Sequence, residues 1–141
     1  MRKINKVIVH HSDSDIASHD NISVIKDWHL QRGFKDVGYH YFINKSGNIQ
    51  LGRNHATAGA HTLGHNKDSI GICLHGRKHF TTQQFSSLIK IVRELQSIYH
   101  LQNTDVYGHN EFSDKTCPNF DVSRLFNRNI GNLDPKTEKR I

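Results

Sequence analysis

Residues 4–12 read INKVIVHHS, a run of β-prone side chains that ends in two histidines and a serine. The apolar residues of this run favour an extended backbone, so we expect a strand over residues 4–10. His10 then closes the strand, at a point where side chains from strand ends and adjoining loops converge. His10 is therefore the first candidate functional residue of the chain.

Helices and strands alternate along the rest of the chain. We expect helices over residues 23–32, 82–99 and 121–129, and strands over residues 39–44, 49–51, 69–75 and 106–108. The second and third strands flank a turn and form a hairpin, which makes one pair antiparallel. The sequence thus predicts an α/β fold, a single domain with a mixed central β-sheet flanked by helices.

Capping residues support two of the helices. The helix over residues 82–99 is the clearest, because its apolar residues are spaced three and four apart and Thr81 with Gln84 resembles a capping box. Asn21 or Ser23 can cap the first helix. Both helices are therefore expected to be specified locally.

Two segments are expected to lie outside regular structure. Residues 53–68 are rich in Gly, His, Asn and Thr without periodicity, which predicts a long loop of the kind that often carries function. Residues 131–141 are expected to form a flexible tail after a folded domain over residues 1–130.

The chain has 141 residues, a formal net charge of +6 and 12 histidines. A basic protein concentrates near polyanions such as nucleic acid, anionic lipid or an anionic cell wall, but scattered Lys and Arg can equally just keep a surface solvated. The apolar run at the N-terminus is too short for a signal peptide, and no stretch is long enough to span a membrane. We therefore expect a chain made in the cytoplasm and no integral membrane function.

Two histidines and one cysteine form a candidate metal site. His10 and His109 each follow a strand, and Cys117 lies in a polar loop eight positions after His109, whereas Cys73 lies in an apolar run and is expected to be buried and inert. Two imidazoles and a thiolate suit zinc and leave a fourth position for water, which zinc activates for amide hydrolysis. On spacing alone, ordinary surface histidines and a free thiol remain the alternative.

A series of motifs occurs in one order over residues 7–126. They are VIVHHS (7–12), WH (28–29) with GF (33–34), DVGYH (36–40), GR (52–53), GAH (59–61), Asn66 with SIGICL (69–74), HNE (109–111) and KTCPNFD (115–121). In these motifs the chain resembles the N-acetylmuramoyl-L-alanine amidases of the type-two amidase and peptidoglycan recognition protein family, above all the short bacteriophage endolysins. That family has a mixed-sheet fold, in agreement with the pattern of elements.

The resemblance implies a role for each matching residue. One zinc ion is expected on His10, His109 and Cys117, with Tyr39 and Lys115 as the catalytic pair; whether Tyr39 acts as a base or orients water is open. His11 is expected beside the ligands or at the rim of the site. Substrate contacts are expected from His61, Asn66 and Arg53, and structural roles from Trp28, His29 and His40.

The implied activity is hydrolysis of the amide between the lactyl group of N-acetylmuramic acid and L-alanine in bacterial peptidoglycan. We expect a monomeric phage lysin over residues 1–130 that reaches the wall through a membrane lesion and binds neither nucleic acid nor membrane. Some phage relatives also bind an RNA polymerase, and that property is not carried over to this chain.

Three other functions compete with this one. A peptidoglycan-binding protein of the same fold without catalysis typically lacks the ligand cysteine, and the presence of Cys117, Tyr39 and Lys115 argues against it. A nucleic-acid module with structural zinc needs a fourth ligand and a basic stripe, neither of which is evident. A metallopeptidase uses nearly the same chemistry.

Overall fold

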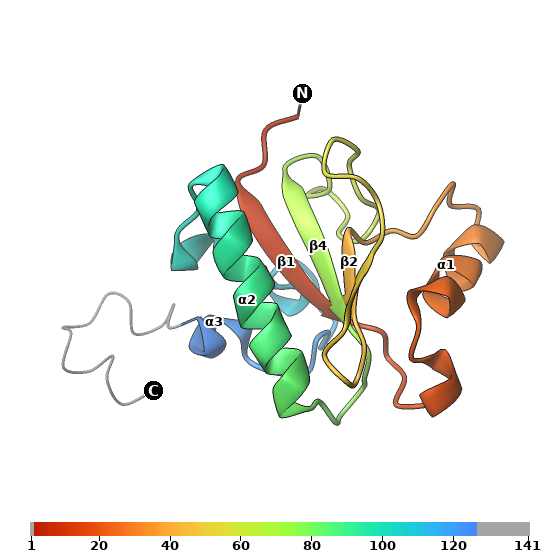
Figure 1. The fold of residues 1–141 in the computed structure, drawn as a ribbon. Coiled ribbons are helices and arrows are strands. Elements are labelled where there is room, and N and C mark those ends of the chain that lie inside the picture. Colours follow the sequence, from red (N-terminus) through yellow and green to blue (C-terminus); the bar gives the residue numbers. More distant parts are fainter. Residues whose placement is uncertain (1, 127–141) are drawn as a thin grey trace.

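A five-stranded sheet forms the centre of the computed structural model, which describes residues 2–126 (Figure 1). Its strands, in the order β3–β2–β4–β1–β5, are β1 (Lys6–His11), β2 (Tyr41–Ile43), β3 (Ile49–Leu51), β4 (Ser69–Leu74) and β5 (Val106–Gly108). β2, β4, β1 and β5 run parallel, and β3 pairs antiparallel with β2. The mixed sheet predicted from the sequence is therefore confirmed.

Three α-helices accompany the sheet in the described part of the chain. They are α1 (Ile22–Gln31), α2 (Thr82–Tyr99) and α3 (Val122–Leu125), together with single turns of 3-10 helix at Ala17–His19, Asn103–Asp105 and His109–Glu111. The helix expected over residues 121–129 is shorter within the described residues, because Asp121 caps its start and Phe126 follows its last turn. Residues 127–129 and the expected tail over 131–141 lie outside the described residues.

Local capping is as the sequence predicted. The side chain of Asn21 accepts a hydrogen bond from the Ser23 backbone N–H at the start of α1. Thr81 and Gln84 form a reciprocal capping box at the start of α2. His100 then ends α2 in the left-handed conformation with a φ of 57°, which the sequence analysis did not anticipate.

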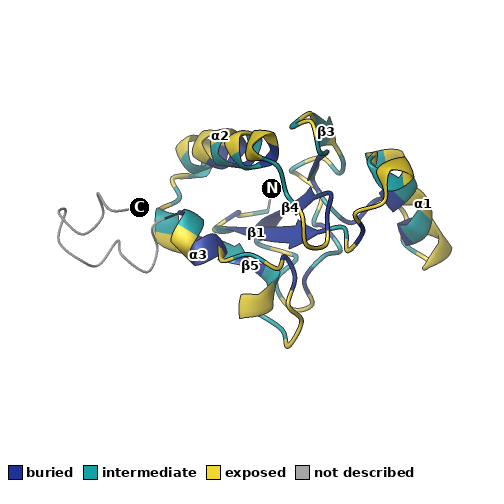
Figure 2. Cartoon of the chain, turned by 90° about the horizontal axis from the view of Figure 1, so that it is seen from below, coloured by how far each residue is buried: buried dark blue, intermediate teal, exposed yellow. Residues whose placement is uncertain are grey.

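The two faces of the sheet carry different coverings, because successive side chains of a strand point to opposite faces. One face packs against α2, with Val7, Val9 and Ile72 meeting Leu88 and Val92 in the main core. Figure 2 shows the strands β1 and β4 as buried and the outer side of α2 as largely exposed.

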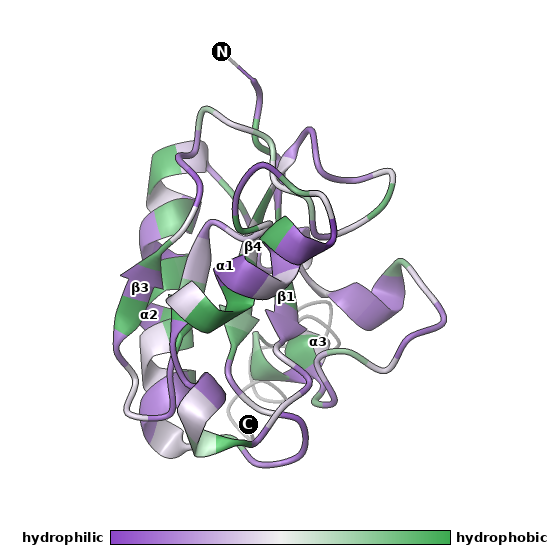
Figure 3. Cartoon of the chain, turned by 90° about the vertical axis from the view of Figure 1, so that its right-hand side faces the viewer, coloured by the Kyte–Doolittle hydropathy of each residue, from purple (hydrophilic) through white to green (hydrophobic). Residues whose placement is uncertain are grey.

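The opposite face has a smaller core next to α1. Phe42 and Cys73 pack there against Ile25 and Val37, with Trp28 partly buried against them. By the alternation along β1, His10 points to this face, away from α2. Figure 3 views this side and shows hydrophilic segments around the labelled part of β1.

The loop over residues 53–68 contains no helix or strand, as predicted, and lies beside this second face. The guanidinium of Arg2 donates to the backbone carbonyl oxygens of His55, Lys67 and Ser69 at 2.7–3.1 Å. The N-terminal segment thereby fastens both ends of the loop. Among residues 2–126, no helix has the length and apolarity that crossing a membrane requires.

Candidate metal and catalytic site

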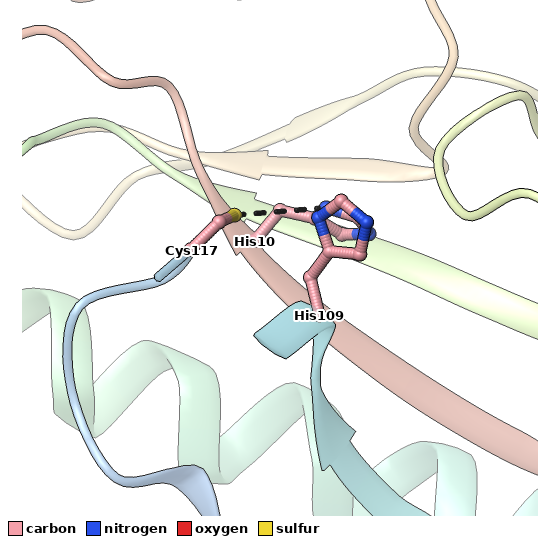
Figure 4. A group of neighbouring side chains, drawn as sticks. All are labelled: His10, His109 and Cys117. Atoms are coloured by element: carbon pink, nitrogen blue, oxygen red, sulfur yellow. Dashed lines mark hydrogen bonds between the residues drawn. The ribbon is translucent and has the colours of Figure 1, made fainter. Parts of the chain in front are cut away.

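Three side chains from distant parts of the chain meet at the end of β1 (Figure 4). β1 and β5 are parallel neighbours with Val9 beside Gly108, so His10 and His109, the next residues, lie at the same edge. The loop after His109 returns with Cys117. One ligand atom from each of the three residues lies within 4.8 Å of the others, and His10 Nδ1 is 3.9 Å from Cys117 Sγ.

The donor set fits a zinc ion. Tetrahedral zinc with Zn–N near 2.0 Å and Zn–S near 2.3 Å needs ligand atoms about 3.3–3.6 Å apart. The three ligand atoms, which lie within 4.8 Å of one another, would have to approach by up to about 1.5 Å. Burial, followed by charge repulsion from His61 and His109, holds the pKa of His10 well below its usual value. The pKa of His109 is lowered too, first by burial and then by Lys115. Both shifts favour the neutral imidazole, which is the form that binds a metal ion.

The sulfur is also suited to a cation. Both Cys73 and Cys117 are free and buried, so no disulfide joins them. Burial raises the pKa of Cys117 to about 11, although the backbone N–H of His11 donates to its sulfur at 3.2 Å and opposes that rise. A divalent cation beside Cys117 Sγ favours the thiolate that burial alone disfavours.

Tyr39 and Lys115 flank the three candidate ligands. The Tyr39 ring lies 5.1 Å from the His10 ring, centroid to centroid, and Lys115 is an exposed residue two positions before Cys117. Burial, followed by the neighbouring Cys73 and Cys117, raises the pKa of Tyr39 well above its ordinary value. Tyr39 is therefore a neutral phenol, and its hydroxyl donates a hydrogen bond to the Cys73 sulfur.

A cleft of about 860 Å³ opens over these residues. It is bordered by α1, by residues 60–66 of the loop and by the segment 109–117. Its lining includes the three candidate ligands, Tyr39, Lys115, Trp28, His29, Arg32, Phe34, His61, Thr62, Leu63, Asn66 and Phe112. A volume of this size accommodates a ligand larger than a single amino acid.

The three residues expected to contact substrate lie in different places. His61 and Asn66 line the cleft, and Asn66 Oδ1 accepts the backbone N–H groups of His61 and Thr62 at 2.9 Å each. Arg53 is not among the lining residues. Its guanidinium donates to the backbone carbonyls of Val37 at 2.7 Å and Ala58 at 2.8 Å.

The residues expected to be structural make buried contacts. His29 Nδ1 accepts the backbone N–H of Gly38 at 2.8 Å, and His40 Nδ1 accepts that of Gly71 at 3.1 Å. His11 Nε2 lies 3.1 Å from the amide nitrogen of Asn119, so His11 borders the site beside Cys117.

Two residues that support the site, one beside His10 and one farther away, were not predicted from the sequence. Thr62 is 2% exposed, and its hydroxyl lies 3.2 Å from His10 Nε2. Arg2 fastens the loop that carries Thr62. Neither residue has a local signal, since a Thr next to a motif histidine and a single Arg at the N-terminus are both ordinary surface patterns.

Comparison with known proteins places this site in a family. Residues 1–120 match the family model described as N-acetylmuramoyl-L-alanine amidase. The endolysin of Enterobacteria phage K11 is 31% identical over 131 residues, which cover 87% of this chain and 85% of that protein. The N-acetylmuramoyl-L-alanine amidase LysC from Clostridium intestinale has a TM-score of 0.80 at 30% identity, over 90% of this chain and 85% of that one.

A further solved structure contains a ligand. A variant of Drosophila PGRP-LB in complex with tracheal cytotoxin has a TM-score of 0.73 at 25% identity, over 94% of this chain and 83% of that one. The solved structures agree with the mixed sheet, and the family model and the phage relatives match over most of the chain. The chain belongs to the N-acetylmuramoyl-L-alanine amidase family and is a peptidoglycan amidase of the endolysin type.

Proposed function

We propose that this chain uses one zinc ion to hydrolyse the amide between the lactyl group of N-acetylmuramic acid and the first L-alanine of the stem peptide. The supporting observation is that His10, His109 and Cys117 bring one ligand atom each within 4.8 Å at the floor of the cleft. The zinc ion, when bound, supplies a Lewis acid that activates water and polarises the amide carbonyl.

Lys115 and Tyr39 act on the oxygen of the reacting amide. Attack on the carbonyl carbon turns that oxygen into an oxyanion, and the Lys115 ammonium at the cleft edge stabilises the negative charge. The Tyr39 hydroxyl donates a hydrogen bond to the same oxygen or to the attacking water, which fixes its position. Both groups act most strongly on the transition state, where the charge has developed.

Asn66 is the residue we propose for contact with the stem peptide. Its side-chain oxygen is used by two backbone N–H groups, and its amide nitrogen is a donor for a peptide carbonyl in the cleft. Arg53 is left out of this proposal because backbone carbonyls occupy its guanidinium. The complex of the PGRP-LB variant with tracheal cytotoxin supports ligand binding by this fold.

The endolysin relatives support a proposal for the cellular setting. We propose that the chain is made in the host cytoplasm, acts as a monomer and reaches the wall through a membrane lesion. Among the relatives, endolysins from several phages match over most of their length.

Digestion of purified peptidoglycan tests the activity. The zinc-loaded protein is expected to release stem peptides that begin with L-alanine and to leave the glycan strands uncut, as read by mass spectrometry. Chelation should abolish the release, and added zinc should restore it. New reducing ends, or cleavage between amino acids, would contradict the proposal, and binding without release would make the chain a recognition protein.

A further inference from the structure

A cluster of polar atoms lies behind the His10 ring, on the side away from Cys117. His10 Nδ1 faces Cys117 Sγ (Figure 4), and its other nitrogen, Nε2, faces the loop over residues 53–68. There it lies 2.8 Å from His61 Nδ1 and 3.2 Å from Thr62 Oγ1. The Thr62 hydroxyl is in turn 2.9 Å from His61 Nδ1. These three atoms form a closed triangle.

The direction of the hydrogen bonds in this triangle follows from the proposed function, on which this inference rests. If His10 binds zinc through Nδ1, its proton is on Nε2 and must be donated. The proton goes either straight to His61 Nδ1 or to the Thr62 hydroxyl, which then donates its own proton to His61 Nδ1. Both routes make Nδ1 of His61 an acceptor and leave its proton on Nε2.

The chain continues beyond His61 in the same direction. His61 Nε2 lies 3.2 Å from Ser69 Oγ, and the Ser69 hydroxyl donates to the backbone carbonyl oxygen of His65 at 2.7 Å. Ser69 is fully buried at the start of β4. The series therefore ends on a fixed carbonyl, and every donor along it has an acceptor.

Two glycines make room for the His61 ring. A Cβ at Gly71 would lie 2.6 Å from His61 Cδ2 and 2.8 Å from Nε2, and a Cβ at Gly59 would lie 2.6 Å from Cδ2. Neither glycine has a positive φ, so space rather than backbone conformation requires them. The ring thus occupies a built cradle between β4 and the loop.

We propose that His61 is a positioning residue for the first zinc ligand. By accepting the Nε2 proton of His10, directly or through Thr62, it holds His10 in the tautomer whose Nδ1 faces the metal. This role differs from the substrate contact expected from the sequence, because both ring nitrogens of His61 are engaged inside the protein.

Zinc affinity of the full chain tests the role, measured by competition with a chromophoric chelator. His61→Asn keeps an acceptor near the place of Nδ1, whereas His61→Gln reaches the place of Nε2 and His61→Ala has neither. We expect His61→Ala and His61→Gln to bind zinc about 10–100-fold more weakly than the wild type, and His61→Asn to recover most of that loss. Thermal unfolding of the zinc-free variants checks that each is folded.

Nitrogen-15 NMR of the imidazoles in the zinc-loaded wild type provides a second test that needs no variant. It is expected to show His10 protonated on Nε2 and His61 protonated on Nε2 alone. A proton on Nδ1 of His61 would overturn the proposal. An unchanged zinc affinity in folded His61→Ala would also overturn the proposal. An equal loss of zinc affinity in all three variants would overturn it too, because it would indicate that the ring merely fills space.

The two proposals fail in different ways. A wild-type protein that binds no zinc removes the proposed metal function and, with it, this inference. A wild type that binds zinc and cleaves peptidoglycan, alongside folded variants that keep their zinc affinity, removes only the role of His61.

Discussion

Lys115 has an exposed side chain at the cleft edge, two residues before Cys117. Replacing it by Met retains the length of the side chain and removes the charge that stabilises the oxyanion. We expect Lys115→Met to lower kcat by about 10²–10³-fold while zinc content stays unchanged. Steady-state kinetics on a soluble muropeptide and metal analysis measure the two quantities.

Lys90→Met is the matched control for that experiment, because Lys90 is an exposed residue of α2 that does not line the cleft. Its kcat should equal that of the wild type. An unchanged kcat in Lys115→Met, or an equal loss in both variants, would show that the Lys115 charge has no part in the reaction.

The two cysteines should respond differently to substitution. Cys117→Ser replaces the sulfur of the three-residue site by a harder oxygen, and we expect zinc affinity to fall more than tenfold. Cys73→Ala removes a buried sulfur outside that group, so it should cost about 1 kcal/mol of unfolding free energy and leave zinc affinity unchanged. Competition with a chelator and urea unfolding test both, and an equal effect of the two substitutions on zinc affinity would refute the assignment of Cys117.

At the scale of elements, the segment between α1 and β2 sets the position of Tyr39. The backbone N–H of Gly38 donates to His29 Nδ1 on α1, and a Cβ at Gly38 would lie 2.2 Å from the Ala60 carbonyl oxygen. Gly38 therefore lets α1, the loop and the strand that begins at Tyr41 approach closely. A side chain there must push the Tyr39 segment away from the loop.

We expect Gly38→Ala to lower the unfolding free energy by about 1–3 kcal/mol and also to lower kcat, through displacement of Tyr39. Gly33→Ala is the control, since nothing lies within 4 Å of its added Cβ and its φ of +91° alone costs about 1 kcal/mol. Urea unfolding measures the loss of stability in each variant, and steady-state kinetics measures kcat, which should fall only in Gly38→Ala. A Gly38→Ala protein with wild-type kcat would mean that the close approach does not position Tyr39.

At the scale of the whole molecule, the buried histidines make stability depend on pH. Burial is the largest cause that lowers the pKa of His29 and of His40 to about 4 each, well below the usual 6.5. Between pH 4 and 6.5 the unfolded chain binds protons at these positions and the folded chain does not. The unfolding free energy is therefore highest above pH 6.5 and falls as the pH is lowered through this window.

For His40, which is 1% exposed, the loss between pH 7 and pH 5 is on the order of 2 kcal/mol. Urea unfolding of the zinc-free protein at the two pH values measures it. His40→Asn keeps an acceptor for the Gly71 N–H and cannot titrate, so it should be less stable at pH 7 but show a weaker pH dependence. If the unfolding free energy of the variant depended on pH as strongly as that of the wild type, His40 would be ruled out as a cause of the pH dependence.

Local patterns predicted much of the architecture and the motif residues of the site. The spacing of apolar residues and the capping box sufficed for α2, because a helix is stabilised by contacts between residues three and four apart. Two of the expected strands lead directly to His10 and His109. This placement, together with the order of the motifs, was enough to select the candidate ligands. The bounds expected for this helix, residues 82–99, are those of α2, and only the left-handed conformation of His100 after it had no signal in the sequence.

What the sequence alone determined is the family, the alternation of helices and strands, and the set of side chains able to bind metal and stabilise an oxyanion. Only the tertiary structure decided that Arg53 donates to backbone carbonyls, that Arg2 fastens the loop, and that the His61 ring lies behind His10. His61 and His10 are 51 positions apart, and Arg2 and Ser69 are 67 apart. The physical reason is that the contacts of a long loop depend on the surface over which it folds, and no local periodicity encodes that surface.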